Sequence, residues 1–228
     1  MIRILALGDR DERYLTHREV DAAFAIFPPD VDISWVATDS SDARTLAHAD
    51  GIWLLPGSPY RDDAAAFAAI RHCLDARTPF LGTCAGFQYA CVELARSLAG
   101  LQSAAHAELE PDGSDLVIKP LACSLYGELR LVQPIAGTRL AAICGDRPFQ
   151  GFHYCGYGLD ERYAQVLVEH GVVVGATADD AGVEAIEMPN HPFFMATSFQ
   201  PQVGVSTSQR LPPLLDAFLA GARSHASE

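Results

Sequence analysis

The chain has 228 residues, of which 49% are hydrophobic, and its formal net charge is -13 with a pI of about 4.9. This length and composition allow one large core, so a single domain is expected over residues 1–228, and the negative charge disfavours nucleic acid and anionic membranes as partners. Because no run approaches the roughly 18 apolar residues that span a bilayer, and the N-terminus lacks the apolar core of a signal peptide, we expect a cytosolic protein.

Short apolar runs alternate with amphipathic stretches along the chain, which is typical of a βαβ architecture. In chain order, the first half is predicted to form strands at residues 2–7, 32–36, 52–55 and 80–81 and helices at residues 20–27, 62–76 and 85–99. Strand-rich antiparallel or mixed sheet is expected from about residue 115 to 185, followed by the last elements: a helix near 161–170, a strand at 194–199 and a helix at 214–223. These elements predict an α/β, flavodoxin-like sandwich with a mostly parallel sheet and helices on both faces.

The segment PFLGTCAGFQYA, residues 79–90, runs from a buried strand through a Gly-rich turn directly into a helix. Such a turn projects its central side chain, here Cys84, into the open at the carboxyl end of the sheet. The helix N-terminus favours a thiolate, and the N–H of Ala85 can stabilise an oxyanion. The alternative is a buried cysteine in an apolar βα unit, but the flanking Gly82 and Gly86 favour a nucleophile.

The pattern Gly-x-Cys-x-Gly-x-Gln at residues 82–88 resembles the nucleophile elbow of class I glutamine amidotransferases, most of all the glutaminase domain of CTP synthase. The resemblance covers nearly the whole chain. The chain is similar to the stand-alone group of CTP synthase C-terminal-region-related proteins, which includes selenoproteins. Further matching segments lie at residues 56–62, 87–100, 105–114, 126–132 and 190–199.

The resemblance implies a glutamine-type pocket with a set of binding groups. Gly57 and Ser58, in PGSPYRD, fall on the oxyanion loop, although Pro59 has no N–H to donate. Gln88 and Glu108 fall where the family binds its substrate, and Glu108 matches the acid that receives the α-amino group.

The chain departs from the family pattern at the base and at the carboxylate clamp. Phe-His-Pro-Glu of the family is replaced by Phe-Gln-Pro-Gln, so the catalytic His falls on Gln200 and its orienting acid on Gln202. An amide has no useful basicity near neutral pH, so ordinary glutaminase activity is not expected. The Arg that grips the glutamine carboxylate falls on Gly156, and Arg61 is a candidate replacement.

Several residues could replace the missing base. His17 follows the first strand, near the sheet edge where α/β sites are built, and His106 lies two residues before Glu108. A surface histidine near a helix start is the alternative for His17. His153 is a weaker candidate, and His191 is interpreted as structural because it belongs to a segment shared with active relatives.

The remaining cysteines and motifs suggest no cofactor. Six cysteines show neither CxxC nor zinc-ligand spacing, and most are interpreted as small buried hydrophobes. Cys155 could pair with Cys84 in redox chemistry, although nothing in the spacing requires it. No phosphate-binding loop is present, so no nucleotide cofactor and no metal are predicted, and a homo-oligomer stays open.

Two hypotheses follow from these residues. The first is a cysteine-dependent hydrolase or transferase, in which Cys84 attacks a carbonyl or nitrile-like carbon of a small amine-bearing metabolite. His17 or His106 would then transfer the proton. The second is a binding or regulatory protein that keeps the pocket without the chemistry. Thiolate reactivity separates them, because an enzyme needs a depressed Cys84 pKa and a binder does not.

Overall fold

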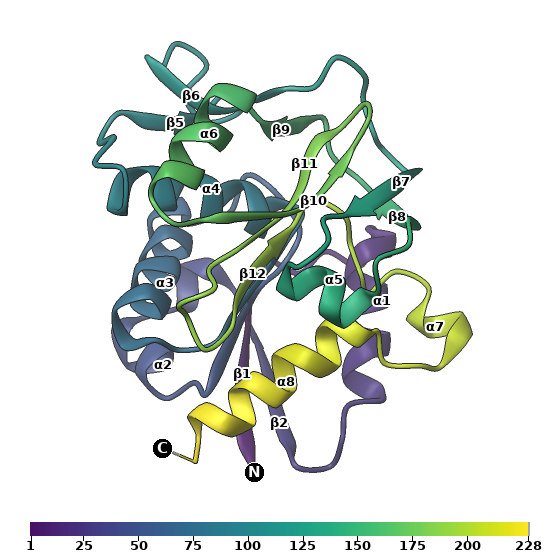
Figure 1. Cartoon of the computed structure of the whole chain (residues 1–228). Coiled ribbons are helices and arrows are strands. Elements are labelled where there is room, and N and C mark those ends of the chain that lie inside the picture. The colour runs from purple at the N-terminus through teal and green to yellow at the C-terminus, as the bar shows by residue number, and fades with distance from the viewer. Residues whose placement is uncertain (228) are drawn as a thin grey trace.

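The computed structural model describes residues 1–227, which fold into strands and helices that alternate through the first half of the chain (Figure 1). The strands are β1 (Ile2–Leu7), β2 (Val31–Val36), β3 (Gly51–Leu54), β4 (Phe80–Thr83), β5 (Ala104–His106), β6 (Asp115–Pro120), β7 (Glu128–Pro134), β8 (Phe149–His153), β9 (Tyr157–Leu159), β10 (Val173–Ala178), β11 (Gly182–Glu187) and β12 (Phe194–Thr197). The helices are α1 (Leu15–Ala25), α2 (Ala43–Ala47), α3 (Asp63–Ala76), α4 (Ala85–Ser97), α5 (Arg139–Cys144), α6 (Glu161–Glu169), α7 (Val205–Ser208) and α8 (Pro213–His225), with a short 3-10 turn η1 (Thr38–Ser40).

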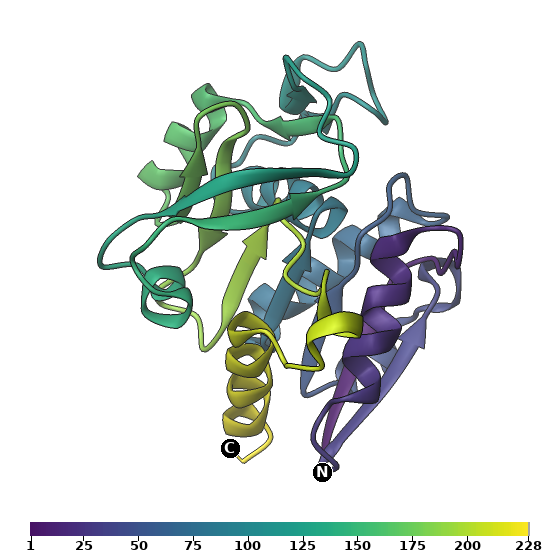
Figure 2. The same ribbon diagram turned by 90° about the vertical axis from the view of Figure 1, so that its right-hand side faces the viewer.

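Nine of the strands form one mixed sheet, in the order β2-β1-β3-β4-β12-β11-β10-β7-β8. Neighbouring strands are parallel from β2 to β12 and antiparallel from β12 to β8. A second sheet, in the order β5-β6-β9, has three strands. Figure 2 shows the teal strands β7 and β8 curving away from the parallel strands β1 to β4, which are coloured purple to blue. The parallel part is therefore confined to five strands, and the rest of the sheet is antiparallel.

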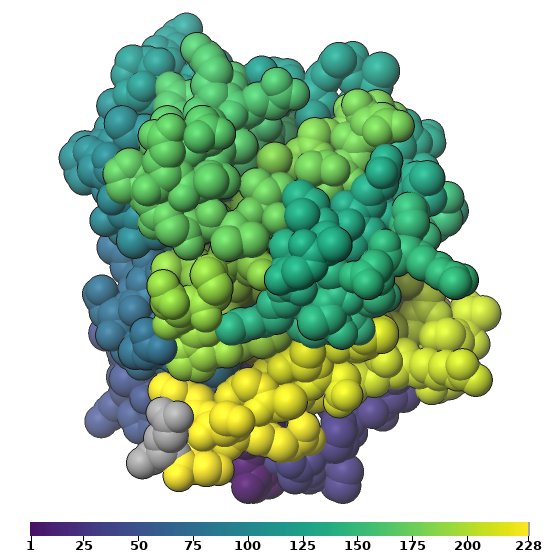
Figure 3. All heavy atoms as spheres, in the orientation of Figure 1, coloured from purple at the N-terminus to yellow at the C-terminus, as the bar shows by residue number. Residues whose placement is uncertain are grey.

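Apolar side chains fill both faces of the large sheet. One cluster packs α3, α4 and α6 against one face and includes Phe67, Phe87 and Leu167. The other packs α1, α5 and α8 against the opposite face, with Val20 and Phe218 among its members. Figure 3 shows α8, in yellow, crossing the lower part of the molecule below the green strands. No helix within residues 1–227 is long and apolar enough to cross a bilayer.

The α/β sandwich with helices on both faces is confirmed, and the predicted elements match the observed ones within a few residues except at the start of α1. The pattern predicted that helix from residue 20, but the helix begins at Leu15. Its first turn was missed because Thr16, His17 and Glu19 are polar and yet buried. Glu19 accepts hydrogen bonds from Ser206 N and Oγ at 2.9 and 2.5 Å. Apolar periodicity does not register polar residues that are buried through such partners.

Candidate functional site

A pocket of about 360 Å³ lies where four neighbouring parallel strands end. The segments that follow β1, β3, β4 and β12 all contribute to it, as expected at the carboxyl edge of an open α/β sheet. The antiparallel half closes the other side. The lining residues are Asp9, Arg10, Asp11, Tyr14, Thr16, His17, Pro56, Gly57, Ser58, Pro59, Arg61, Cys84, Gln88, Glu108, Tyr126, Tyr154, Cys155, Gly156, Tyr157 and Gln200.

Cys84 sits on the turn between β4 and α4, with φ 55° and ψ -106°. A non-glycine residue at positive φ is uncommon and costs free energy, and such residues cluster at functional sites. The two flanking glycines, Gly82 and Gly86, have no side chain that would collide with the neighbouring backbone. A Cβ on Gly86 would lie 2.3 Å from the Leu54 carbonyl oxygen, and one on Gly82 would lie 2.7 Å from the Gly86 carbonyl oxygen. Both glycines therefore allow close packing of backbone against backbone.

Cys84 and Cys155 both line the pocket, and their thiols interact across it. This interaction and burial together raise the pKa of Cys84 well above its usual value, whereas the N–H of Ala85 lowers it less. The interaction with Cys84 also lowers the pKa of Cys155. The helix N-terminus alone would favour a thiolate on Cys84. In the folded chain the interaction with Cys155 and burial outweigh the helix N-terminus at Cys84, and it is the pKa of Cys155 that is lowered.

His153 and Glu184 form a fully buried pair beside Cys155. His153 Nε2 lies 2.8 Å from a Glu184 carboxylate oxygen, and Nδ1 lies 3.1 Å from the Gly151 carbonyl oxygen. Since both ring nitrogens face acceptors, the site suits an imidazolium. Burial lowers the pKa of His153, but the hydrogen bond and charge of Glu184 outweigh it, and the net pKa is raised.

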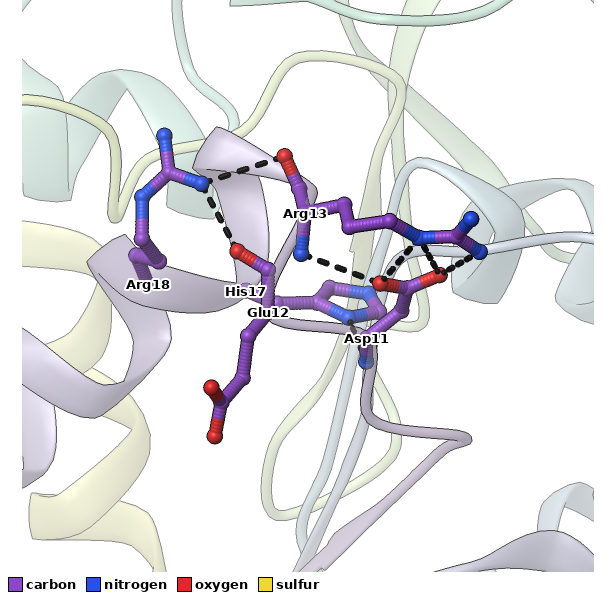
Figure 4. A network of polar contacts seen from close by, with 5 residues as sticks. All are labelled: Asp11, Glu12, Arg13, His17 and Arg18. Atoms are coloured by element: carbon purple, nitrogen blue, oxygen red, sulfur yellow. Dashed lines mark hydrogen bonds and ion pairs between the residues drawn. The ribbon is translucent and has the colours of Figure 1, made fainter.

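His17 lines the pocket, and both of its ring nitrogens are engaged. Its Nδ1 accepts the N–H of Asp11 at 2.9 Å, so Nε2 carries the proton and donates to the Pro56 carbonyl oxygen at 2.8 Å. Figure 4 shows the His17 ring beside Asp11, whose carboxylate is bound by Arg13. Burial lowers the pKa of His17. To act as a base, His17 would have to give up one of these hydrogen bonds.

His106 lies behind the pocket wall and is not among the lining residues. Its Nδ1 accepts the N–H of Glu108 at 3.0 Å, and its Nε2 donates to Gln88 Oε1 at 3.0 Å. Gln88 in turn donates from Nε2 to the Tyr157 carbonyl oxygen at 2.9 Å. Burial lowers the pKa of His106 to about 4, so it is neutral near pH 7. His106 thus orients the two predicted binding residues, Gln88 and Glu108.

Gln200 and Gln202 are hydrogen-bonded to each other. Gln202 Nε2 donates to Gln200 Oε1 at 3.0 Å, which turns the Gln200 amide nitrogen away from that bond. Gln200 Nε2 is buried and has no acceptor within the described part of the chain, and Gln200 lines the pocket. Gln200 Nε2 is therefore an unpaired donor, within the described residues, on a side chain that lines the same pocket as Cys84.

Glu108 lines the pocket with a buried carboxylate oxygen, Oε2, which has no hydrogen-bond partner among residues 1–227. A buried carboxylate oxygen without a hydrogen-bond partner costs free energy, so a ligand group that donates a hydrogen bond to this atom would be stabilised there. Two residues that line the pocket, Glu108 and Gln200, therefore each carry a buried polar atom without a partner among residues 1–227: an acceptor on Glu108 and a donor on Gln200.

The other predicted binding residues also reach the pocket, except Ala85, which lies behind Cys84. Gly57, Ser58 and Gly156 line it, and so does Arg61, whose exposed side chain lies 3.7 Å from Asp39. A Cβ on Gly156 would lie 3.6 Å from the Tyr126 hydroxyl, so a tyrosine borders the space beside this glycine.

His191 lies outside the pocket, with Nε2 at 2.9 Å from the Cys73 carbonyl oxygen, which agrees with a structural role. Within residues 1–227 no three His, Cys, Asp or Glu side chains gather in a group that could hold a metal ion.

The model of the glutamine amidotransferase class-I family matches residues 16–216. The chain belongs to this family. Among curated proteins, it is 34% identical to CTP synthase of Geobacillus kaustophilus over 207 residues, covering 85% of the chain and 39% of that protein. It is 31% identical to CTP synthase of Methanopyrus kandleri over 241 residues, covering 97% of the chain and 45% of that protein. The chain therefore spans less than half the length of these CTP synthases.

Two solved structures have the same class I amidotransferase fold. The glutaminase domain of Trypanosoma brucei CTPS, with bound acivicin, superposes with a TM-score of 0.83 at 23% identity, covering 98% of this chain and 94% of that one. A glutamine amidotransferase from Thermotoga maritima superposes with a TM-score of 0.61 at 15% identity, covering 100% of this chain and 86% of that one. The predicted family and fold are confirmed.

Sequence reasoning missed part of this amidotransferase pocket. The four tyrosines Tyr14, Tyr126, Tyr154 and Tyr157 line it, and neighbouring rings such as Tyr126 and Tyr154 pack edge to face with centroids 5.2 Å apart. Asp9, Arg10, Asp11 and Thr16 were missed as well. Their position after β1 was a usable signal, because residues that follow a parallel strand gather at the same edge. Tyr126, Tyr154 and Tyr157 lie in or beside segments that the resemblance had marked, at residues 126–132 and at Gly156, but nothing singled out the tyrosines themselves.

Proposed function

We propose that this amidotransferase-family chain is a cysteine-dependent hydrolase or transferase acting on a small amine-bearing metabolite, and that it is no ordinary glutaminase. One observation carries the proposal: Cys84, Glu108 with its unpaired acceptor and Gln200 with its unpaired donor all line one pocket within the described residues. An ammonium group of the ligand meets Glu108, and a carbonyl or carboxylate oxygen meets Gln200.

In the proposed reaction, Cys84 attacks a carbonyl or nitrile-like carbon of the ligand. Cys155 interacts with Cys84 and takes its proton without any rearrangement, whereas His17 or His106 would first have to break a hydrogen bond. The N–H groups of Ala85 and of the Gly57-Ser58 loop hold the developing oxyanion. Gln200 supplies a further hydrogen bond, because an amide cannot serve as a base.

The identity of residues 200, 202 and 156 supports the loss of glutaminase activity. By resemblance these positions hold the base, its orienting acid and the carboxylate clamp, and here they are Gln200, Gln202 and Gly156. Ammonia release from glutamine by the purified protein is therefore expected to stay well below about 1 per second, the lower end of ordinary turnover. Turnover at or above that rate would contradict the proposal.

A thermal-shift screen of amines, amino-acid amides and free amino acids tests the binding half of the proposal. Amine-bearing compounds are expected to stabilise the wild type, and Glu108→Gln should weaken their binding by about 10- to 100-fold, since a charge-assisted hydrogen bond contributes about 1.5–3 kcal/mol. Glu110→Gln is the matched control, because Glu110 is exposed and lies outside the lining residues. If only amine-free compounds bind, or if Glu108→Gln binds amines as the wild type does, Glu108 is structural.

A second candidate function is a non-catalytic binding protein that uses the same pocket. It is favoured by the raised pKa of Cys84 and by the occupied ring nitrogens of His17 and His106. Both functions predict amine binding. They differ in chemistry, because only the enzyme forms a covalent intermediate at Cys84 with amine-bearing amides, esters or nitriles, which intact-protein mass spectrometry detects.

A further inference from the structure

Two cysteines from opposite halves of the sheet meet in the pocket. Cys84 follows β4 in the parallel half, and Cys155 follows β8 at the antiparallel end. Both residues line the pocket and both are 6% exposed. The sulfur of Cys84 also lies 3.8 Å from the carbonyl oxygen of Tyr154, the residue before Cys155. The two sulfurs are thus neighbours at a solvent-accessible site.

Backbone and side-chain donors surround both sulfur atoms. The backbone N–H of Ala85 lowers the pKa of Cys84, and the backbone N–H of Tyr157 lowers the pKa of Cys155. The buried His153, whose two ring nitrogens face acceptors, adds positive charge close to Cys155. Thiolates are the reactive form of cysteine, and donors of this kind stabilise them.

The other cysteines lack these features. Cys73 and Cys91 are fully buried, and burial raises the pKa of each. Burial also raises the pKa of Cys144, to about 11. Cys123 is exposed and lies outside the pocket. Only Cys84 and Cys155, of the six, combine a neighbouring thiol, hydrogen-bond donors and a pocket that admits a small molecule.

We propose that Cys84 and Cys155 form a redox-active dithiol that reduces low-molecular-weight organic disulfides by thiol–disulfide exchange. The Cys155 thiolate attacks one sulfur of the disulfide RSSR, forming a mixed disulfide and expelling RS⁻. Cys84 loses its proton to that leaving thiolate and attacks the Cys155 sulfur, expelling the second RS⁻. The products are the Cys84–Cys155 disulfide and two RSH, the second thiolate taking a proton from solvent. A reducing thiol reverses the reaction.

The position of each cysteine explains this order of attack. The pKa of Cys155 is lowered by its interaction with Cys84 and by the charge of His153, so Cys155 is the first of the pair to form a thiolate. Cys84 keeps its proton until Cys155 has reacted, because the neighbouring anion disfavours a second thiolate. Cys84 has a separate proposed role as a nucleophile toward carbon. Oxidation of the pair would block that role, because the disulfide consumes the Cys84 thiol.

Glutathione disulfide is a suitable probe, used on full-length protein in a Cys123→Ser background that removes the exposed thiol. The background protein is expected to lose two hydrogen atoms in mass, and non-reducing peptide mapping should join Cys84 to Cys155. Cys84→Ser should stop at one glutathione on Cys155, since no second thiol resolves it and the serine hydroxyl can still donate to the sulfur. Cys155→Ser should react about tenfold or more slowly, at Cys84.

Three results would overturn the proposal: an unchanged mass in protein that circular dichroism shows to be folded, a disulfide joining another pair of cysteines, or an equally fast intramolecular disulfide in Cys84→Ser. Mapping of the background protein uses no variant of the pocket, so misfolding of a pocket variant cannot hide the answer. The assay reads neither amine binding nor turnover. Its failure is therefore distinguishable from failure of the proposed function.

Discussion

His106 forms hydrogen bonds with two pocket residues at once, Gln88 and Glu108, and the residue type alone does not predict these contacts. One ring nitrogen accepts the Glu108 N–H and the other donates to Gln88. The sequence suggested a base facing Cys84, because a histidine two residues before a binding acid is close to the pocket. The fold turns the ring behind the wall, where it positions the residues that bind.

A pH dependence of stability follows from this burial. The pKa of His106 falls from 6.5 to about 4 on folding, so between these values the unfolded chain binds the proton more tightly and unfolding is favoured as the pH drops. This destabilisation of the folded state is about 3 kcal/mol at pH 4, about 0.4 kcal/mol at pH 6.5 and negligible above about pH 7.5. We expect His106→Gln to lose less stability on acidification than the wild type, measured by urea unfolding from pH 7 to pH 4.

His48→Gln is the matched control, because His48 is exposed. It should follow the wild-type pH curve. An identical acid response of His106→Gln and the wild type would mean that His106 is already accessible to protons in the folded state.

The turn between β4 and α4 shows how an element constrains its own sequence. Gly86 is required because a Cβ there would lie 2.3 Å from the backbone oxygen of Leu54 at the end of β3. This position was recognised from the pattern of residues 82–86 alone, because a strand that enters a helix through so short a turn leaves no room for side chains. The boundaries of α3 were predictable for a similar local reason, since Asp62 accepts the Ala65 N–H at 3.0 Å as its N-cap.

Substitution of two glycines should separate steric collision from backbone strain. Gly86→Ala drives a methyl group into backbone that cannot move without parting α4 from β3, and we expect it to cost more than about 3 kcal/mol of unfolding free energy. Gly100 has a left-handed φ of 69°, but a Cβ at this position would meet no atom within 4 Å. Gly100→Ala should therefore cost about 1 kcal/mol of unfolding free energy. Chemical denaturation measures both. A cost for Gly86→Ala no greater than that for Gly100→Ala would show that the turn can relax.

The chain as a whole carries a formal net charge of -13. Like charges repel more strongly in the compact state than in the unfolded chain, and salt screens them. We therefore expect the melting temperature to rise by a few degrees when salt increases from about 20 to about 300 mM, where the screening length falls below about 10 Å. Sodium chloride and choline chloride should act alike. A fall in melting temperature, or a rise with one cation only, would contradict general screening.

At this scale the sequence determined the family, the α/β sandwich and the nucleophile turn, because strand and helix periods, caps and the elbow at residues 82–86 are local properties of the chain. Only the tertiary structure decided the state of the pocket. It placed Cys155 against Cys84, paired His153 with Glu184 and occupied both nitrogens of His17. These contacts join residues far apart in the chain. Their pKa shifts depend on burial and on neighbouring charge, which are defined only once the two halves of the sheet have packed together.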